Sequence, residues 1–222
     1  MLDVRENFVE AANQYEQLWP ASQDPAVAHG LARSWRLLGR TDDARRLLDD
    51  WLTAHPDDPA ILTERGKLAL EEDAFEKGAT LLRRAVALAP HSIEANNALH
   101  YCLNKKGRKA EAQECTDRIR RAKENREQLT ALTRRLQQAP ENADLRCQVA
   151  QLFFQLGQEE EAVRWLHVTL QSRPNHGPSH LALADYYEKV GQVTLAAQHR
   201  RLASSDSGIR IPDSGLKSQN QQ

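Results

Sequence analysis

Apolar and small residues recur along this chain in a pattern that repeats every 34 positions. Pro56 and Pro90 are separated by 34 residues, and Pro140 and Pro174 repeat that spacing. Each proline closes a segment in which apolar residues follow the period of an α-helix on both sides of a central turn. A repeat of this length holds two helices and two short turns, and such units stack on one another. The pattern therefore predicts an all-α protein, an α-solenoid of antiparallel helix pairs.

Each unit can be numbered from 1 to 34, with the proline at position 32. Positions 4, 7, 8 and 11 then share one face of the first helix, and positions 20, 24 and 27 share one face of the second. Small residues at 8 and 20 let the two helices approach closely, and glycine at 15 ends the first helix in the left-handed conformation. The first unit, which begins at Pro25, fills these positions with Ala28, Leu31, Ala32, Trp35, Gly39, Ala44, Leu48, Trp51 and Pro56.

The third unit breaks the period. It carries Glu124 where proline is expected, and Ala112 and Ala162 are 50 residues apart, 16 more than one period. Neither glycine nor proline occurs between Lys109 and Gln138. We therefore predict about five units, with a long basic connecting helix over 109–139 at a seam after the third; a tight turn near 123–125 is the alternative. The first three units span 25–124 and the last two span 143–203.

The two ends of the chain differ in character. Residues 1–19 predict one helix, spaced like the second helix of a unit; it is either a cap or half of a repeat in a longer solenoid, and we favour the second interpretation. Residues 204–222 are polar and predict a flexible tail. The N-terminus has no apolar secretory segment and no apolar run could span a bilayer, so we expect a cytoplasmic protein if Met1 is the true start.

Charge and cysteine content narrow the possible functions. The net charge is −1, but residues 105–135 carry 11 basic and 5 acidic side chains. Acids interleave with the basic patch of Arg118, Arg120 and Arg121, which favours a solvated helix with internal ion pairs over an anion-binding surface. The three cysteines have no paired spacing, and this fits a reduced compartment; Cys102 and Cys115 are expected to be buried.

Chemistry-bearing motifs are missing from the sequence. It has no glycine-rich phosphate loop, no nucleophile elbow and no HExxH motif. The eight histidines do not cluster along the chain, and no Cys or acid completes a metal-ligand set. Paired acids such as Asp42 and Asp43 precede helices, where capping explains them. We therefore expect no enzymatic activity, no cofactor and no metal.

The unit pattern resembles the tetratricopeptide repeat family, closely over 25–92 and 143–203 and more loosely over 93–124. This resemblance implies a right-handed superhelix whose first helices line a concave groove through positions 2, 5, 6, 9, 12 and 13. Carried over residue by residue, the implied groove positions include His29, Arg33 and Arg36; Glu64, Lys67 and Glu71; Asn97, Tyr101, Asn104 and Lys105; Cys147, Gln148, Gln151, Phe154 and Gln155; Leu181, Asp185 and Glu188.

Two groups of these residues suggest a binding mode. Asn97, Tyr101 and Asn104 form a stripe of amides around one aromatic ring, suited to bonding an extended peptide backbone while one side chain stacks on the ring. Phe154 is either an exposed anchor or packs at the seam against the long helix. The residues of the carboxylate clamp found in some relatives are absent. We predict a non-enzymatic scaffold that binds a peptide or helix of an unidentified protein. The alternatives are a single-stranded RNA-binding repeat protein or a regulatory segment of a larger enzyme; nucleic acid is the less favoured partner, no membrane partner is expected, and self-association is possible.

Overall fold

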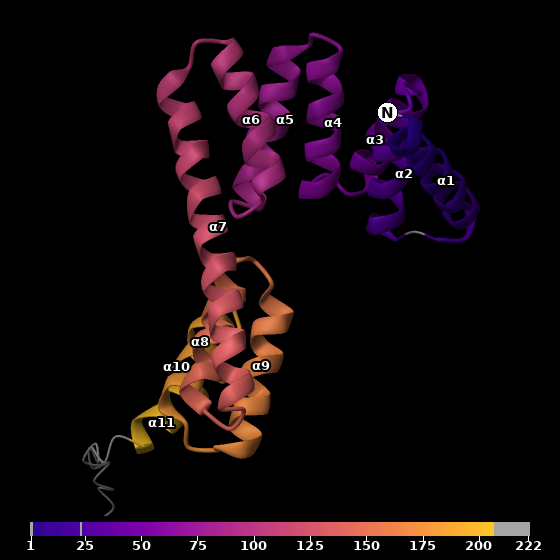
Figure 1. Cartoon of the computed structure of the whole chain (residues 1–222). Helices are drawn as coiled ribbons and strands as arrows, with labels where there is room; N and C mark the ends of the chain where they lie inside the picture. The colour runs from indigo at the N-terminus through magenta and orange to yellow at the C-terminus, as the bar shows by residue number, and fades with distance from the viewer. Residues whose placement is uncertain (1, 23, 207–222) are drawn as a thin grey trace, which may run out of the picture. The chain divides into compact units, whose positions relative to one another are not determined.

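The computed structural model describes residues 2–22 and 24–206. In these ranges the chain is helical, without strands, and Figure 1 shows the helices in chain order. The elements are α1 (Leu2–Leu18), the short 3-10 helix η1 (Trp19–Ala21), α2 (Pro25–Leu37), α3 (Thr41–Ala54), α4 (Pro59–Glu71), α5 (Phe75–Leu88), α6 (Ile93–Lys105), α7 (Lys109–Gln138), α8 (Ala143–Gln155), α9 (Glu159–Ser172), α10 (Gly177–Lys189) and α11 (Val193–Asp206). The predicted all-α architecture is confirmed.

The chain divides into two compact parts, which we call the N-terminal part (residues 1–124) and the C-terminal part (residues 125–222) to distinguish them from the repeat units. In the N-terminal part α2 packs against α3 and α4 against α5, and α4 also contacts α2 and α6. In the C-terminal part α8 packs against α9 and α10 against α11, and α10 contacts both α8 and α9. Each part is therefore a stack of helix pairs, in which the first helix of one pair lies against the first helix of the next.

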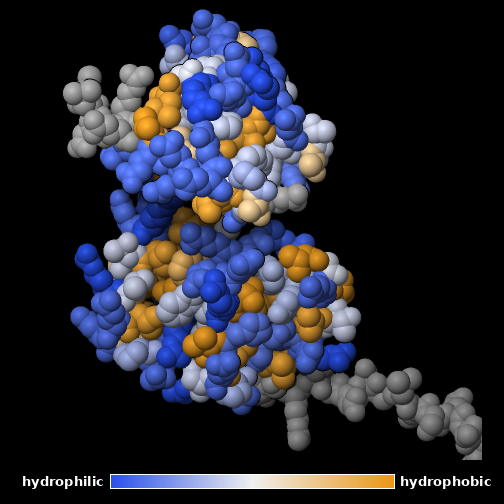
Figure 2. Space-filling view, turned by 90° about the vertical axis from the view of Figure 1, so that its right-hand side faces the viewer, coloured by the Kyte–Doolittle hydropathy of each residue, from blue (hydrophilic) through white to orange (hydrophobic). Residues whose placement is uncertain are grey.

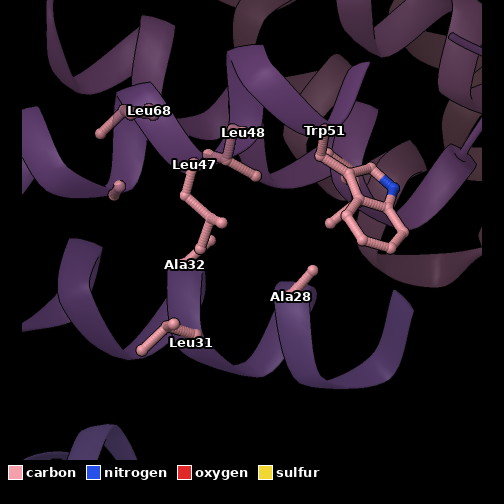
Figure 3. Close-up of a cluster of buried hydrophobic side chains, with 9 residues drawn as sticks. Ala28, Leu31, Ala32, Leu47, Leu48, Trp51 and Leu68 are labelled. Carbon is pink, nitrogen blue, oxygen red and sulfur yellow. The ribbon is translucent and has the colours of Figure 1, made fainter. Parts of the chain in front are cut away.

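Small residues allow the close packing of each pair, as the pattern predicts. Ala32 and Ala44, at positions 8 and 20 of the first unit, are fully buried between α2 and α3. Leu31, Leu48 and Trp51 fill the remaining space around them, in the cluster that Figure 3 draws. Burying an aliphatic side chain of this size stabilises a fold by about 1.5–3 kcal/mol. The repeating positions are therefore the core.

The turns between paired helices use a left-handed residue at position 15. Asp73 occupies this position in the second unit with φ 58°, a conformation that a non-glycine residue rarely adopts. The other units place glycine there, with φ between 69° and 80°: Gly39, Gly107, Gly157 and Gly191. The turn geometry is therefore the same in every unit, and only the second keeps a side chain in it.

The long helix is confirmed and the alternative of a turn near 123–125 is wrong, because α7 continues without a break from Lys109 to Gln138. In the N-terminal part Ala112 and Cys115 of α7 join a buried cluster with Leu99 and Leu103 of α6. In the C-terminal part leucines of α7 pack against α8: Leu129, Leu132 and Leu136 with Leu145 and Val149.

At the C-terminal end, α11 continues to Asp206, so residues 204–206 are helical; the rest of the predicted flexible tail, 207–222, lies outside the described residues. Hydrophilic side chains cover most of the face shown in Figure 2. None of the described helices combines the length and the apolar character needed to cross a bilayer.

Candidate functional site

In residues 1–124 the first helices of the repeats gather three predicted groove residues, the cations Arg36 and Lys67 and the imidazole of His29, around one buried carboxylate. Glu64 of α4 has no exposed side-chain surface. Arg36 of α2 donates to it from Nε at 2.9 Å, and Lys67, one turn along α4, donates from Nζ at 2.8 Å. His29 of α2 lies with Nε2 3.7 Å from the same carboxylate. The position that the resemblance assigns to the groove surface is thus a buried link between two helices, which corrects the expectation for Glu64.

Electrostatics keep this buried carboxylate ionised. Burial by itself raises the pKa of Glu64, but the hydrogen bond from His29 and the charges of Arg36 and Lys67 outweigh it, so its pKa lies far below the ordinary value. Arg36 also pairs with Glu71, and Lys67 also pairs with Glu94 of α6. Two of the predicted groove cations are therefore already paired within the protein. Arg33, on the same helix as Arg36, is exposed.

The same region contains a group of potential metal ligands. His29, Glu64 and Glu94 each offer one ligand atom, and these atoms lie within 4.8 Å of one another. The Lys67 ammonium contacts both carboxylates, so a cation of the protein itself already stands between them. Sequence reasoning did not bring these residues together, because they come from three separate helices.

On α6 the predicted stripe is open to solvent. Asn97, Tyr101 and Asn104 are all exposed, Tyr101 by 51%. The Asn104 amide donates to Nε2 of His100 at 3.1 Å, and the Lys105 ammonium lies 5.7 Å from the centre of the Tyr101 ring. The Asn97 side chain has no hydrogen-bond partner within the described ranges. Unlike Arg36 and Lys67, this stripe keeps most of its hydrogen-bonding groups available.

In the C-terminal part of the chain, α8 presents amides beside a pair of stacked aromatic rings. Gln148 and Gln151 are exposed, and the Phe154 ring stacks on Tyr186 of α10 with centroids 5.5 Å apart at 24°. Phe154 is therefore half-buried rather than freely exposed. Its neighbour Phe153 joins the leucines of α7 in a cluster to which Phe154 does not belong, so the predicted alternative of packing against the long helix describes Phe153.

Cys147 of α8 also departs from its groove assignment, since it is buried with only 2% of its surface exposed. Burial raises the pKa of its thiol, and a hydrogen bond with Ser179 of α10 partly opposes that rise. Cys102 and Cys115 are buried free thiols, as expected, and burial raises the pKa of both. Position 5 of α8 is therefore covered by the helix that follows it in the stack.

The predicted basic patch is largely paired along its own helix. Arg118 pairs with Glu114 at 3.2 Å, and Arg120 pairs with Asp117 and Glu124, both at 3.3 Å. The third member of the patch, Arg121, donates from Nε to the backbone carbonyl oxygen of residue 117 at 3.3 Å. These contacts between neighbouring turns are those expected of a solvated charged helix.

Two histidines that are distant in the sequence meet in the C-terminal part of the chain. His180 of α10 and His199 of α11 approach with their Nδ1 atoms 2.8 Å apart, and His180 Nε2 lies 2.9 Å from the carbonyl oxygen of Pro174. That carbonyl can only accept, so His180 Nε2 carries the hydrogen of this contact. Burial, followed by the charges of His180 and His167, lowers the pKa of His199. These two histidines are 19 residues apart in the sequence, so no spacing along the chain predicts their contact.

Comparisons with known proteins cover most of the chain. Two family models described as tetratricopeptide repeat match it, one over residues 5–68 and 69–136 and the other over 122–205. No curated protein matches. Among solved structures, "MamA MSR-1 C2" is 22% identical and superposes over 82% of this chain and 95% of its own, with a TM-score of 0.38. MamA 41-end from Desulfovibrio magneticus RS-1 is 14% identical over 84% and 96%, with a TM-score of 0.39.

Proposed function

This chain belongs to the tetratricopeptide repeat family, and on that premise we propose that it is a non-enzymatic protein-interaction scaffold that binds a segment of a partner protein on the first-helix face of α6. The family supports a role in protein interaction, and the choice of α6 comes from the side chains on its surface. The proposed contact residues are Asn97, Tyr101 and Asn104.

The exposed Tyr101 ring is the observation that carries this proposal. The Tyr101 side chain is 51% exposed, so a partner can bury a large aromatic surface there, and tyrosines are frequent energetic centres of interfaces. The amides of Asn97 and Asn104 flank it at helical spacing and can donate and accept hydrogen bonds. Because α6 is packed on both α4 and α5, these groups sit on a rigid support, which lowers the entropy lost on binding.

Affinity capture with the intact chain, followed by mass spectrometry, tests the proposal. We expect one or more proteins to be retained by the wild type and to bind Tyr101→Ala at least about thirtyfold more weakly, the factor that corresponds to a 2 kcal/mol hot spot. Leu88→Ala is the matched control, because Leu88 of α5 is 44% exposed and lies on a second helix. It should leave binding unchanged.

Unchanged affinity of every retained protein for both Tyr101→Ala and Asn97→Ala would remove the assignment to α6. Circular dichroism of each variant should match the wild type, because both side chains are exposed and make no core contact. The RNA-binding alternative has no comparable support, since its basic residues are paired with acids and a carbonyl on their own helix.

A further inference from the structure

In residues 1–124 the ion pairs between the first helices of successive repeats all have the same direction of charge. At the junction of α2 and α4, the cation Arg36 is on the earlier helix and its acids Glu64 and Glu71 are on the later one. At the junction of α4 and α6, Lys67 is on the earlier helix and Glu94 is on the later one. Both α2 and α4 thus offer a cation to the first helix that follows and receive a carboxylate from it.

The next helix buries only part of the face that takes part in these junctions, since Arg33, at position 9 of α2, stays exposed although α4 follows. Thr63, at position 5 of α4, is 3% exposed in the stack where α6 packs against α4. Asn97 occupies position 5 of α6 and is exposed, and Tyr101 occupies the position that Lys67 holds in α4. Within residues 1–124 the first helices of the repeats are α2, α4 and α6, and the next one, α8, belongs to the other part of the chain. The stripe on α6 is therefore on the side where a following first helix would pack, and the described part of residues 1–124 contains no such helix.

Lys105, at position 13 of α6, is an exposed cation beside this stripe. Its ammonium lies 5.7 Å from the centre of the Tyr101 ring, and no carboxylate of the described residues lies within ion-pairing distance of it. At the two earlier junctions the cations stand at other positions, Arg36 at 12 and Lys67 at 9, and each is paired with two carboxylates. The face of α6 thus presents an aromatic ring and an uncompensated positive charge side by side.

We propose that the partner segment recognised by α6 is an amphipathic α-helix bearing an Asp or Glu that pairs with Lys105 while its apolar face covers Tyr101. This inference rests on the proposed function and adds the secondary structure and the charge of the ligand. A helix fits because a first helix packs against the preceding first helix at both earlier junctions, and an acidic one fits because acids on the later helix pair with the cations there.

A displayed library of amphipathic 18-residue helices, with Asp, Glu, Lys, Arg, Asn, Gln, Ala, Leu and Tyr allowed on one face, provides the test. The intact wild-type chain and Lys105→Glu are used as parallel targets. We expect wild-type binders to be enriched in Asp and Glu, to require Tyr101, and to lose at least about tenfold in affinity on Lys105→Glu. Lys105→Glu should instead select Lys and Arg. Lys77→Glu, the same change at an exposed lysine of α5, should select the same helices as the wild type.

Three outcomes would overturn the inference. Binders that require Tyr101 but show no acidic bias, or keep their affinity for Lys105→Glu, would refute the acidic helix while leaving the proposed function standing. A library that yields no binder dependent on Tyr101, while proteins captured by the wild type do depend on it, would refute the helical ligand alone. Concentration-dependent self-association of the wild type that Tyr101→Ala abolishes would show that a second copy occupies the face.

Discussion

Replacing Glu64 by Gln removes one buried negative charge and keeps the shape of the side chain. Three groups from two helices face that carboxylate: Arg36, Lys67 and His29. The Glu64 side chain is fully buried and that of Arg36 is only 9% exposed, so water cannot replace the lost partner of the guanidinium. The substitution therefore leaves buried positive charge with fewer acidic partners in the stack of residues 1–124.

The expected loss can be bounded from the contacts that remain. Removing one member of a buried ion pair costs about 3–5 kcal/mol. Arg36 keeps Glu71 and Lys67 keeps Glu94, so the loss should lie near the lower bound, about 3 kcal/mol. Glu71→Gln provides the control within the same network. Because the Glu71 side chain is 51% exposed, it should cost at most about 1 kcal/mol.

The effect should also depend on pH. The pKa of Glu64 is lowered in the folded state, so its contribution to the free energy of unfolding is complete above the ordinary pKa of 4.5. That contribution is lost as the pH falls below this value towards the folded-state pKa. The difference in stability between the wild type and Glu64→Gln should thus be largest at pH 7 and shrink progressively at pH values below about 4.5.

Urea unfolding monitored by tryptophan fluorescence measures this difference. In a Trp165→Phe background the remaining tryptophans, Trp19, Trp35 and Trp51, all lie within residues 1–124 and report on the unfolding of that part. The reasoning would be refuted if Glu64→Gln cost no more than Glu71→Gln, or if its cost were the same at pH 3 and pH 7.

Two further substitutions test how far the repeat pattern determines stability. Arg65 is buried at position 7, where other units have an aliphatic residue, and pairs with Asp49 and Glu72. Arg65→Leu should be neutral or stabilising, because a well-packed apolar residue often replaces a buried ion pair without loss, whereas Arg65→Ala should cost about 3 kcal/mol through the cavity that it leaves; urea unfolding ranks the two. Asp73→Gly should raise the melting temperature, since the left-handed conformation at φ 58° costs a non-glycine residue about 1–2 kcal/mol, of which the freedom of glycine in the unfolded chain offsets only a part; a lower melting temperature would show that the Asp73 side chain contributes more than the strain it causes.

The sequence was sufficient to predict the repeat architecture because that information is local and periodic. Positions such as Ala32 and Leu48 contact each other within one unit, so their spacing alone identifies the helix faces that meet. The uninterrupted run without glycine or proline likewise predicted α7. Neither inference needs any knowledge of how one unit lies against the next.

Contacts between units could not be predicted in the same way. Glu64 occupies a position that faces the groove by analogy, and its burial depends on the side chains that Arg36 and Lys67 place beside it. His180 and His199 are 19 residues apart on two helices, so their contact depends on the rotation of α11 about its axis. Such details follow from the packing of particular side chains, which a positional pattern does not encode.

The distribution of paired and unpaired groups explains why position alone is a poor guide to a binding residue in a helical stack. A polar side chain on a first helix has the same position number whether or not another helix follows it, but its chemistry differs. Where a helix follows, as at Lys67, the side chain links two repeats, and substituting it should mainly change stability. Where no further first helix of residues 1–124 follows, as at Tyr101 and Lys105, exposed side chains can be altered at little cost to the stability of the free protein. Substitutions at these two exposed positions should consequently change binding without changing the fold.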